Sequence, residues 1–197
     1  MRERIRLQAL AVYNEAGLEA VSIRAVAKRA GMSPAGIYSF FASRQALIEA
    51  LWLDPVRAML DQMVVQAAAT PDPLVRVRLL LDLFVRFSLA NPEILRGAFL
   101  RVRPTKESAP SPRPLHQLDF HRLLAEAIAE GQTSGHIRPG DPALMAQALW
   151  AGLHGALAIP IHMEAWGLSD PQSLAEEVTT LLMTGLLDGA AHARTGP

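Results

Sequence analysis

The 197-residue chain is expected to be all-α, with an N-terminal three-helix domain that contains a helix-turn-helix and a larger helical domain behind it. Half of the residues are hydrophobic, leucine and alanine dominate, and β-branched runs are few, a composition that favours helices. Five Asx-Pro pairs also place a capping side chain directly before a residue suited to a first helical turn. They are Asp54-Pro55, Asp72-Pro73, Asn91-Pro92, Asp141-Pro142 and Asp170-Pro171.

The first helix is expected over residues 2–16, and a short second one follows over 23–30. Ser22 is suited to cap this second helix, and its apolar residues recur at the spacing of one helical face. Gly31 is expected to end it, because the position after a helix often needs a positive φ, which glycine adopts easily.

The next helix, also short, is predicted over 34–41. Ser33 is suited to cap it, and Pro34 stands at the first helical position, where the missing N–H costs nothing. Two short helices joined by a tight turn that contains glycine form the unit whose second helix enters the major groove of DNA.

This stretch, AGMSPAGIYSFFASRQALIEAL over residues 30–51, resembles the N-terminal domain of the TetR-like repressor family. Phe40 stands where the family usually has histidine, so one polar phosphate contact is lost. Arg44 replaces lysine and keeps the charge, and Gln45 replaces glutamate. The residues in the family's register are Gly31, Ser33, Ile37, Tyr38, Phe41, Ser43, Ala46 and Leu47.

The resemblance implies a cytoplasmic homodimeric transcriptional regulator, most simply a repressor, that binds a palindromic double-stranded DNA operator. Residues 1–47 would form the DNA-binding domain, and 48–197 a domain for dimerisation and effector binding. The two recognition helices would enter successive major grooves, roughly 34–36 Å apart. A small effector in the larger domain would change that spacing and release the DNA.

The charge distribution agrees with this interpretation. Residues 1–50 carry seven basic and four acidic side chains, whereas the whole chain has a net charge of zero. A basic excess on the segment that carries the motif is what phosphate binding requires. The predicted DNA-binding residues are Ser22, Arg24, Lys28, Ser33, Pro34, Ala35, Gly36, Tyr38, Ser39, Phe40 and Arg44. Of these, Ser22, Tyr38 and Arg44 are expected at phosphates, and Ser33, Pro34, Ala35, Gly36 and Ser39 in the groove. Arg24 and Lys28 either add contacts to the DNA or lie on a solvated helix face.

A linking helix is expected from 44 to about 69, with Asp54-Pro55 either kinking it or dividing it into two. The segment 103–114 holds four prolines and no apolar period, which indicates a loop. The remaining helices are expected over 73–90, 92–102, 115–133, 142–164 and 171–192.

The last two helices have the pattern of a dimer interface. Residues 142–161 include no charged side chain, so this helix is expected to be buried on all sides, partly against a second subunit. The alternative is an ordinary monomer core. The predicted interface residues are Ala148, Gly152, Gly155, Ile159, Leu174, Val178, Leu181 and Leu182.

An effector pocket is predicted among the aromatic and methionine residues of the helices between the DNA-binding domain and the last two helices, with Trp150 and His154 near its wall. Its ligand is expected to be rather hydrophobic. Trp150, His154 and Gly155 resemble a tryptophan–histidine–glycine signature of one C-terminal TetR-like subclass. His154 could bind an effector or be a buried structural histidine. The predicted pocket residues are Met63, Phe84, Phe87, Phe99, Phe120, Trp150 and His154.

Other classes of function find little support. The chain has no cysteine, no nucleophile elbow, no phosphate loop and no dinucleotide-binding glycine motif, so we expect no catalytic residues and no cofactor. His116 and His121 are five residues apart, which does not suit a metal site on one helix face, so no metal is expected. The N-terminus does not resemble a signal peptide, and a membrane span is not expected. A helical interaction protein or an enzyme without DNA binding remains the alternative.

Overall fold

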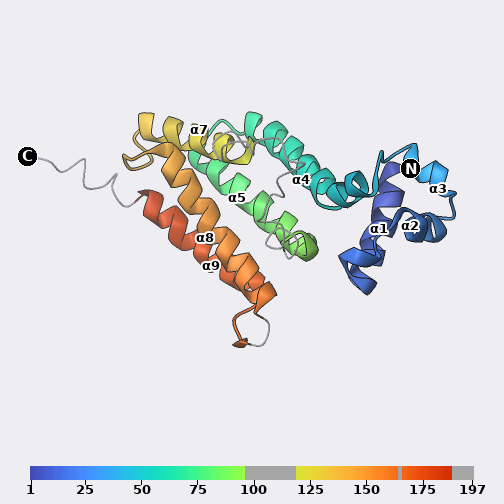
Figure 1. Cartoon of the computed structure of the whole chain (residues 1–197). Coiled ribbons are helices and arrows are strands. Elements are labelled where there is room, and N and C mark those ends of the chain that lie inside the picture. Colours follow the sequence, from blue (N-terminus) through green and yellow to red (C-terminus); the bar gives the residue numbers. More distant parts are fainter. Residues whose placement is uncertain (96–118, 164–165, 188–197) are drawn as a thin grey trace, which may run out of the picture. The chain divides into compact units, whose positions relative to one another are not determined.

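The computed structural model describes residues 1–95, 119–163 and 166–187, and it confirms the all-α class (Figure 1). The chain divides into two compact units, Met1–Ala58 and Met59–Pro197. The boundary lies inside a long helix, α4 (Arg44–Ala68), and later in the chain than the boundary expected after residue 47.

Unit 1 is a small bundle around the helix-turn-helix. Helix α1 packs on α2, and α2 packs on α3. Ile5, Val26, Ile37 and Leu47 are fully buried and form the centre of its core. Its elements are α1 (Arg2–Ala16), a 3₁₀ turn (Leu18–Ala20), α2 (Ile23–Ala30), α3 (Pro34–Tyr38) and the first part of α4.

The expected caps set the ends of the two short helices. The Ser22 hydroxyl accepts a hydrogen bond from the Ala25 N–H at 3.2 Å, and the Ser33 hydroxyl accepts one from the Gly36 N–H at 3.1 Å. Gly31 ends α2 in the left-handed region, at φ 66°. Helix α3 ends at Tyr38, three residues before the predicted end.

Pro55 lies inside α4, which the structure shows as a single helix, so the Asp54-Pro55 pair does not separate two helices. Proline has no N–H, so the carbonyl of Leu51, four residues earlier, loses its helical donor. The Arg6 guanidinium of α1 donates a long hydrogen bond of 3.4 Å to that carbonyl. Arg2 donates to the carboxylate of Asp54 at 3.1 Å. Side chains of α1 thus cover the helix where proline weakens it.

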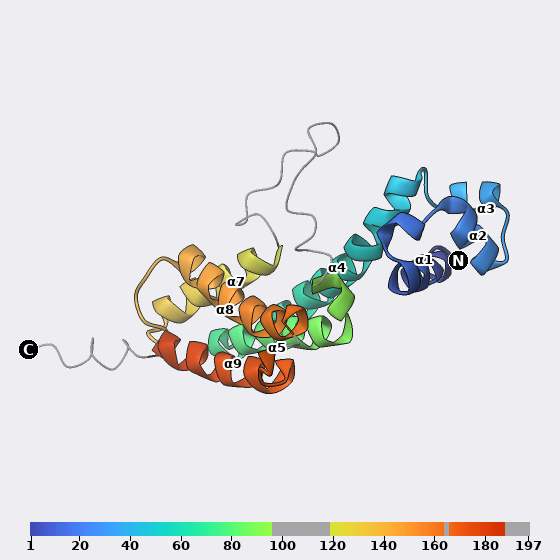
Figure 2. The same ribbon diagram turned by 60° about the horizontal axis from the view of Figure 1, so that its bottom comes forward.

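In unit 2, α8 packs against both α7 and α9, and α5 packs against all three of these helices (Figures 1 and 2). Asp72 and Asp141 cap their helices as expected, through hydrogen bonds from backbone N–H groups to their carboxylates. Another helix begins at Pro92, and its end and the predicted loop 103–114 lie outside the described residues. The elements are the rest of α4, α5 (Pro73–Ala90), α7 (Asp119–Thr133), α8 (Pro142–His162) and α9 (Pro171–Leu187).

The connection between α7 and α8 also holds the end of α9. Arg138 donates from its backbone N–H to the Leu186 carbonyl at 2.9 Å and from Nε to the Gly185 carbonyl at 2.8 Å. These carbonyls belong to the last turn of α9, where intrahelical donors run out. Next to Arg138, Ile137 covers Gly131 so closely that a Cβ on this glycine would lie 2.5 Å from the Ile137 Cδ1 atom.

Helix α8 is long and apolar enough to cross a membrane by length and composition alone. Half of its most apolar 18-residue window is buried inside the chain, and core helices of soluble proteins meet the same criterion. Its packing between α7 and α9 accounts for the buried part of this apolar sequence.

The cap of α2 gives a first prediction. Ser22→Ala should lower the free energy of unfolding by about 1 kcal/mol, because the Ala25 N–H loses its acceptor. Ser39→Ala is the matched control, since the exposed Ser39 hydroxyl makes only a 3.5 Å contact with the Ala35 carbonyl. Urea denaturation measures both. Equal stability of Ser22→Ala and the wild type would contradict the role given to this cap.

Candidate functional site

Helix α3 presents a small and mostly exposed outer face. Ile37 points into the core and is fully buried, whereas the side chain beside it, Tyr38, is 53% exposed. Gly36 is half-buried, and a Cβ there would come within 3.3 Å of the Met32 side chain. The other predicted groove residues and Phe40 are exposed: Ser33, Pro34, Ala35, Ser39 and Phe40. The fold therefore brings the predicted α3 residues together on one accessible face.

Arg44, a predicted phosphate contact, braces the segment before α2. Its Nε donates to the Val21 carbonyl at 2.6 Å and its Nη2 to the Leu18 carbonyl at 3.0 Å. Glu19 lies 3.9 Å from the same guanidinium. Sequence reasoning missed this role, because the carbonyls involved are more than 20 residues away along the chain.

Most other basic side chains of unit 1 also have partners within the unit. Arg29 forms a two-pronged ion pair with Glu15, at 2.7 Å for each hydrogen bond. Arg4 donates to the Ala30 carbonyl at 3.1 Å. Within the described residues, Arg24 and Lys28 on α2 are exposed and make no hydrogen bond or ion pair. These two cations are the ones available to a phosphate backbone.

Helices α8 and α9 share an exposed apolar face. Leu144 on α8 is 63% exposed, Ile159 is 48% exposed, and Leu181 on α9 is 61% exposed. Ala148 is exposed as well. The remaining predicted interface residues are half-buried: Gly152, Gly155, Leu174, Val178 and Leu182. Uncharged side chains of this size exposed together on two adjacent helices indicate a surface that another molecule covers.

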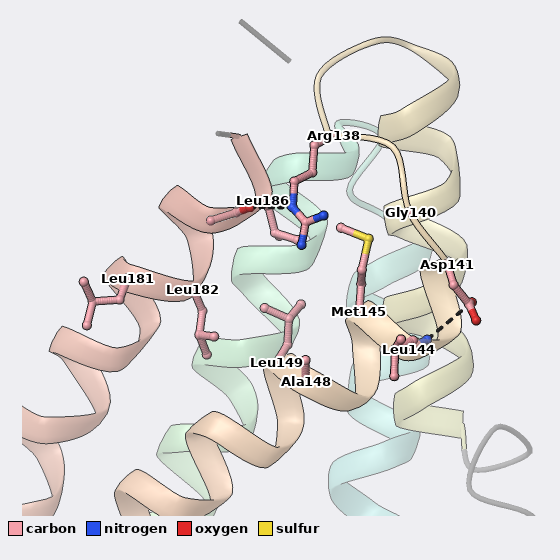
Figure 3. A pocket seen from close by; sticks show the side chains of 11 residues that line it. Arg138, Gly140, Asp141, Leu144, Met145, Ala148, Leu149, Leu181, Leu182 and Leu186 are labelled. Atoms are coloured by element: carbon pink, nitrogen blue, oxygen red, sulfur yellow. Dashed lines mark hydrogen bonds between the residues drawn. The ribbon is translucent and has the colours of Figure 1, made fainter. Parts of the chain in front are cut away.

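Figure 3 shows a groove on this face between the first half of α8 and the last turns of α9, with a volume of about 430 Å³. Leu144 and Ala148 line it from one helix and Leu181 and Leu182 from the other. Gly152, by contrast, faces α9 of its own chain. A Cβ at this glycine would lie 3.0 Å from the Leu182 Cδ1 atom, so Gly152 permits close packing within the monomer.

Four of the predicted pocket residues meet in a cluster of rings in unit 2. Phe84 of α5 stacks on Phe120 of α7, with ring centroids 5.3 Å apart. His154 lies 6.4 Å from Phe84 and 5.1 Å from Trp150, its neighbour one turn earlier on α8. Of the other predicted residues, Met63 is buried on α4 and Phe87 is half-buried on α5 outside the ring cluster, and Phe99 lies outside the described residues.

His121 is a member of this cluster that the sequence analysis did not assign to the pocket. Its imidazole lies edge-on to Trp150 at 5.2 Å and to Phe120 at 5.6 Å. The sequence does contain a signal for the burial of His121, because this residue falls on the same helical face as Leu124 and Ile128, at i+3 and i+7. Both of these residues are fully buried.

Both histidines of the cluster favour the neutral form. Burial lowers the pKa of His121 below its ordinary value. Burial, and to a smaller extent the charge of His162, lowers the pKa of His154. An imidazolium loses hydration in these surroundings, which disfavours the charged state. In the described part of the chain, no group of three or more histidine, aspartate or glutamate side chains could hold a metal ion.

Comparisons with known proteins agree with the geometry. Residues 5–51 match the family model described as bacterial regulatory proteins, tetR family. This match covers the helix-turn-helix and the start of α4, so residues 5–51 are similar to the N-terminal domain of that family. A comparison with curated protein sequences found no match.

Solved structures extend the likeness to the whole chain. The transcriptional regulator FadR of Bacillus subtilis, in complex with stearoyl-CoA, is 18% identical at a TM-score of 0.74, covering 94% of this chain and 99% of its own. A TetR/AcrR regulator of Thermobifida fusca is 22% identical at 0.71, covering 93% and 97%. A regulator of Saccharomonospora viridis, in complex with choline, is 20% identical at 0.67, covering 92% and 94%. The chain therefore has the fold of these regulators in both of its units.

The buried histidines give a prediction on pH. In the unfolded chain both imidazoles take up protons near pH 6.5, but in the folded chain their pKa values are lower. As the pH falls from 7.5 to 5.5 the unfolded state binds more protons, so the free energy of unfolding should decrease. Each histidine contributes at most about 1.4 kcal/mol per pH unit.

Thermal unfolding of His121→Phe should show a shallower loss of stability over the same range. His136→Phe, at an exposed histidine of the same unit, is the control and should behave as the wild type. An identical pH dependence in wild type and His121→Phe would contradict the assignment of a neutral, buried His121.

Proposed function

We propose that this chain is a homodimeric, cytoplasmic transcriptional repressor that binds a palindromic DNA operator and is released by a small, rather hydrophobic effector. The main support is the helix-turn-helix, whose second helix has an exposed outer face of small residues. Small side chains let α3 approach the base edges closely, so base recognition would depend on van der Waals contact with thymine methyl groups and on the Ser39 hydroxyl. No catalytic activity is part of this proposal.

Phosphate contacts would come from groups around α3. Arg24 and Lys28 are exposed on α2, and the Tyr38 hydroxyl is accessible. The Ser22 hydroxyl accepts from the Ala25 N–H and keeps its own hydrogen for a phosphate. Arg44 uses Nε and Nη2 inside the unit, which leaves Nη1 as the donor that could reach DNA.

The proposed dimer rests on the apolar face of α8 and α9. Twofold-symmetric pairing would bring the two copies of this face together, bury Leu144 and Leu181, and make one four-helix interface. A second copy fits better than a charged partner, because residues 142–161 carry no charge at all.

The proposed effector response has two kinds of support. Two structurally similar regulators have been solved with small molecules, one with stearoyl-CoA and one with choline. In this chain, aromatic rings from α5, α7 and α8 gather in unit 2. Unit 2 is joined to unit 1 through α4, so an effector could act on DNA binding through that helix.

Binding to DNA is tested by a mobility-shift assay on the DNA upstream of the gene that encodes this chain. Lys28→Ala should weaken binding to specific and non-specific duplexes alike, and should reduce the slope of log K against log salt by about 0.9, as expected for the loss of one phosphate contact. Its melting temperature should not change, because Lys28 has no partner among the described residues.

Arg44→Ala should weaken binding and also lower the melting temperature, because the Leu18 and Val21 carbonyls lose their donors. Arg86→Ala, at an exposed arginine of unit 2, is the control and should leave both quantities unchanged. Full affinity and an unchanged salt slope in Lys28→Ala would remove that residue from the proposed interface. Absence of any shift with the wild type would overturn the proposed function.

The dimer is tested by light scattering at micromolar concentration. Leu181→Glu should convert the wild-type dimer to a monomer, because the buried carboxylate would meet its own copy in an apolar interface. Val65→Glu is the matched control, since Val65 of α4 is equally apolar and 69% exposed. A monomeric wild type, or a Leu181→Glu variant that stays dimeric, would contradict the proposed interface.

A further inference from the structure

The His121 imidazole lies in apolar surroundings and has no polar partner among the residues that the structure describes. The residue is only 4% exposed, and neither Nδ1 nor Nε2 makes a hydrogen bond to any of them. Its ring neighbours, Phe120 and Trp150, leave both nitrogens unbonded. A buried group of this kind is costly, and where a native fold keeps one it generally has a functional reason or a bound partner.

We propose that His121 hydrogen-bonds the polar group of an uncharged, mainly apolar effector that binds among the rings of Phe84, Phe120 and Trp150. The inference rests on the effector response proposed above. It adds the chemical class of the ligand and the residue that recognises its polar group.

The surroundings select an uncharged ligand. A neutral imidazole offers one N–H donor and one nitrogen acceptor, so a hydroxyl group, which both donates and accepts, complements it fully. The cluster consists of phenylalanine, tryptophan and histidine rings, and no described carboxylate, guanidinium or ammonium group belongs to it. A charged head group would lose its hydration there without gaining a counter-charge.

The burial pattern indicates the side from which a ligand would enter. His121, Phe84 and Phe120 are buried, whereas Trp150 and His154 on α8 are half-buried. The cluster therefore reaches solvent along α8. The Trp150 indole, which lies 5.2 Å from the imidazole, is the ring on that side that a ligand approaching His121 would meet.

Three probes with alkyl chains of nearly equal length separate the head-group classes: 1-decanol below its solubility limit, and decanoate and decyltrimethylammonium below their micellar concentrations. The full-length protein is examined by thermal unfolding and by release of its operator DNA. The chains differ by at most one carbon, so differences report mainly on the head group. Decanol should raise the melting temperature most, because a ligand that binds only the folded state stabilises it. A larger shift with decanoate or the ammonium compound, or no shift with any probe, would overturn the proposal.

His121→Phe then tests the recognising residue. It keeps the ring and removes both nitrogens, so without ligand it should melt roughly 2–4 °C higher than the wild type. Its affinity for decanol should fall at least tenfold. His121→Gln keeps a donor and an acceptor and should retain part of the decanol response, and His136→Phe should retain all of it. A full response in His121→Phe would overturn the proposal.

The failure of this inference and of the proposed function can be told apart. If His121→Phe and the wild type bind operator DNA equally and only the wild type releases it with decanol, both stand. If both proteins bind DNA and both release it with decanol, His121 does not have the proposed role, and the proposed repressor function still stands. If neither binds DNA, the repressor is wrong, and the melting temperatures still decide whether decanol binds at His121.

Discussion

The continuity of α4 past Pro55 is the constraint on which both units depend. The helix contributes Leu47 and Leu51 to the core of unit 1 and Met63 to that of unit 2, so a break at the proline would loosen both. A proline inside a helix costs about 3 kcal/mol or more. The structure offsets this cost locally, because Arg6 supplies a donor to the carbonyl that Pro55 leaves open. A charged side chain of α1 thereby stabilises α4.

The same use of arginine changes how the charge of unit 1 should be understood. By composition, residues 1–50 carry a net charge of +3, which suggests a generally basic DNA-binding surface. Five of the seven cations, however, are engaged within the unit: Arg2, Arg4, Arg6, Arg29 and Arg44. Much of the positive charge holds the helices together. Recognition would then depend on the shape and small side chains of α3 more than on long-range attraction.

The parts of the fold that the sequence predicts are those governed by local chemistry. Ser22, Gly31 and Ser33 act on the backbone within a few residues, so their positions alone predict the ends of α2 and the start of α3. The contacts that the sequence pattern does not predict act over longer distances. Arg44 reaches carbonyls on another segment, and Gly152 makes room for Leu182 on another helix. For such contacts the pattern of residue types is the same whether the partner is DNA, a second subunit or the chain itself.

Gly131 makes the residues tolerated at one position depend on side chains at other positions of the chain. Ile137 fills the space where a side chain on Gly131 would be, and Ile137 directly precedes the arginine that binds the last carbonyls of α9. A larger residue at position 131 would displace Ile137 and, with it, Arg138 from the end of a helix on the exposed apolar face. During divergence of the chain, positions 131, 137 and 138 should therefore change together or not at all. Whether a substitution in α7 is tolerated would then depend on its effect on α9, a helix that lies some 40 positions further along the sequence.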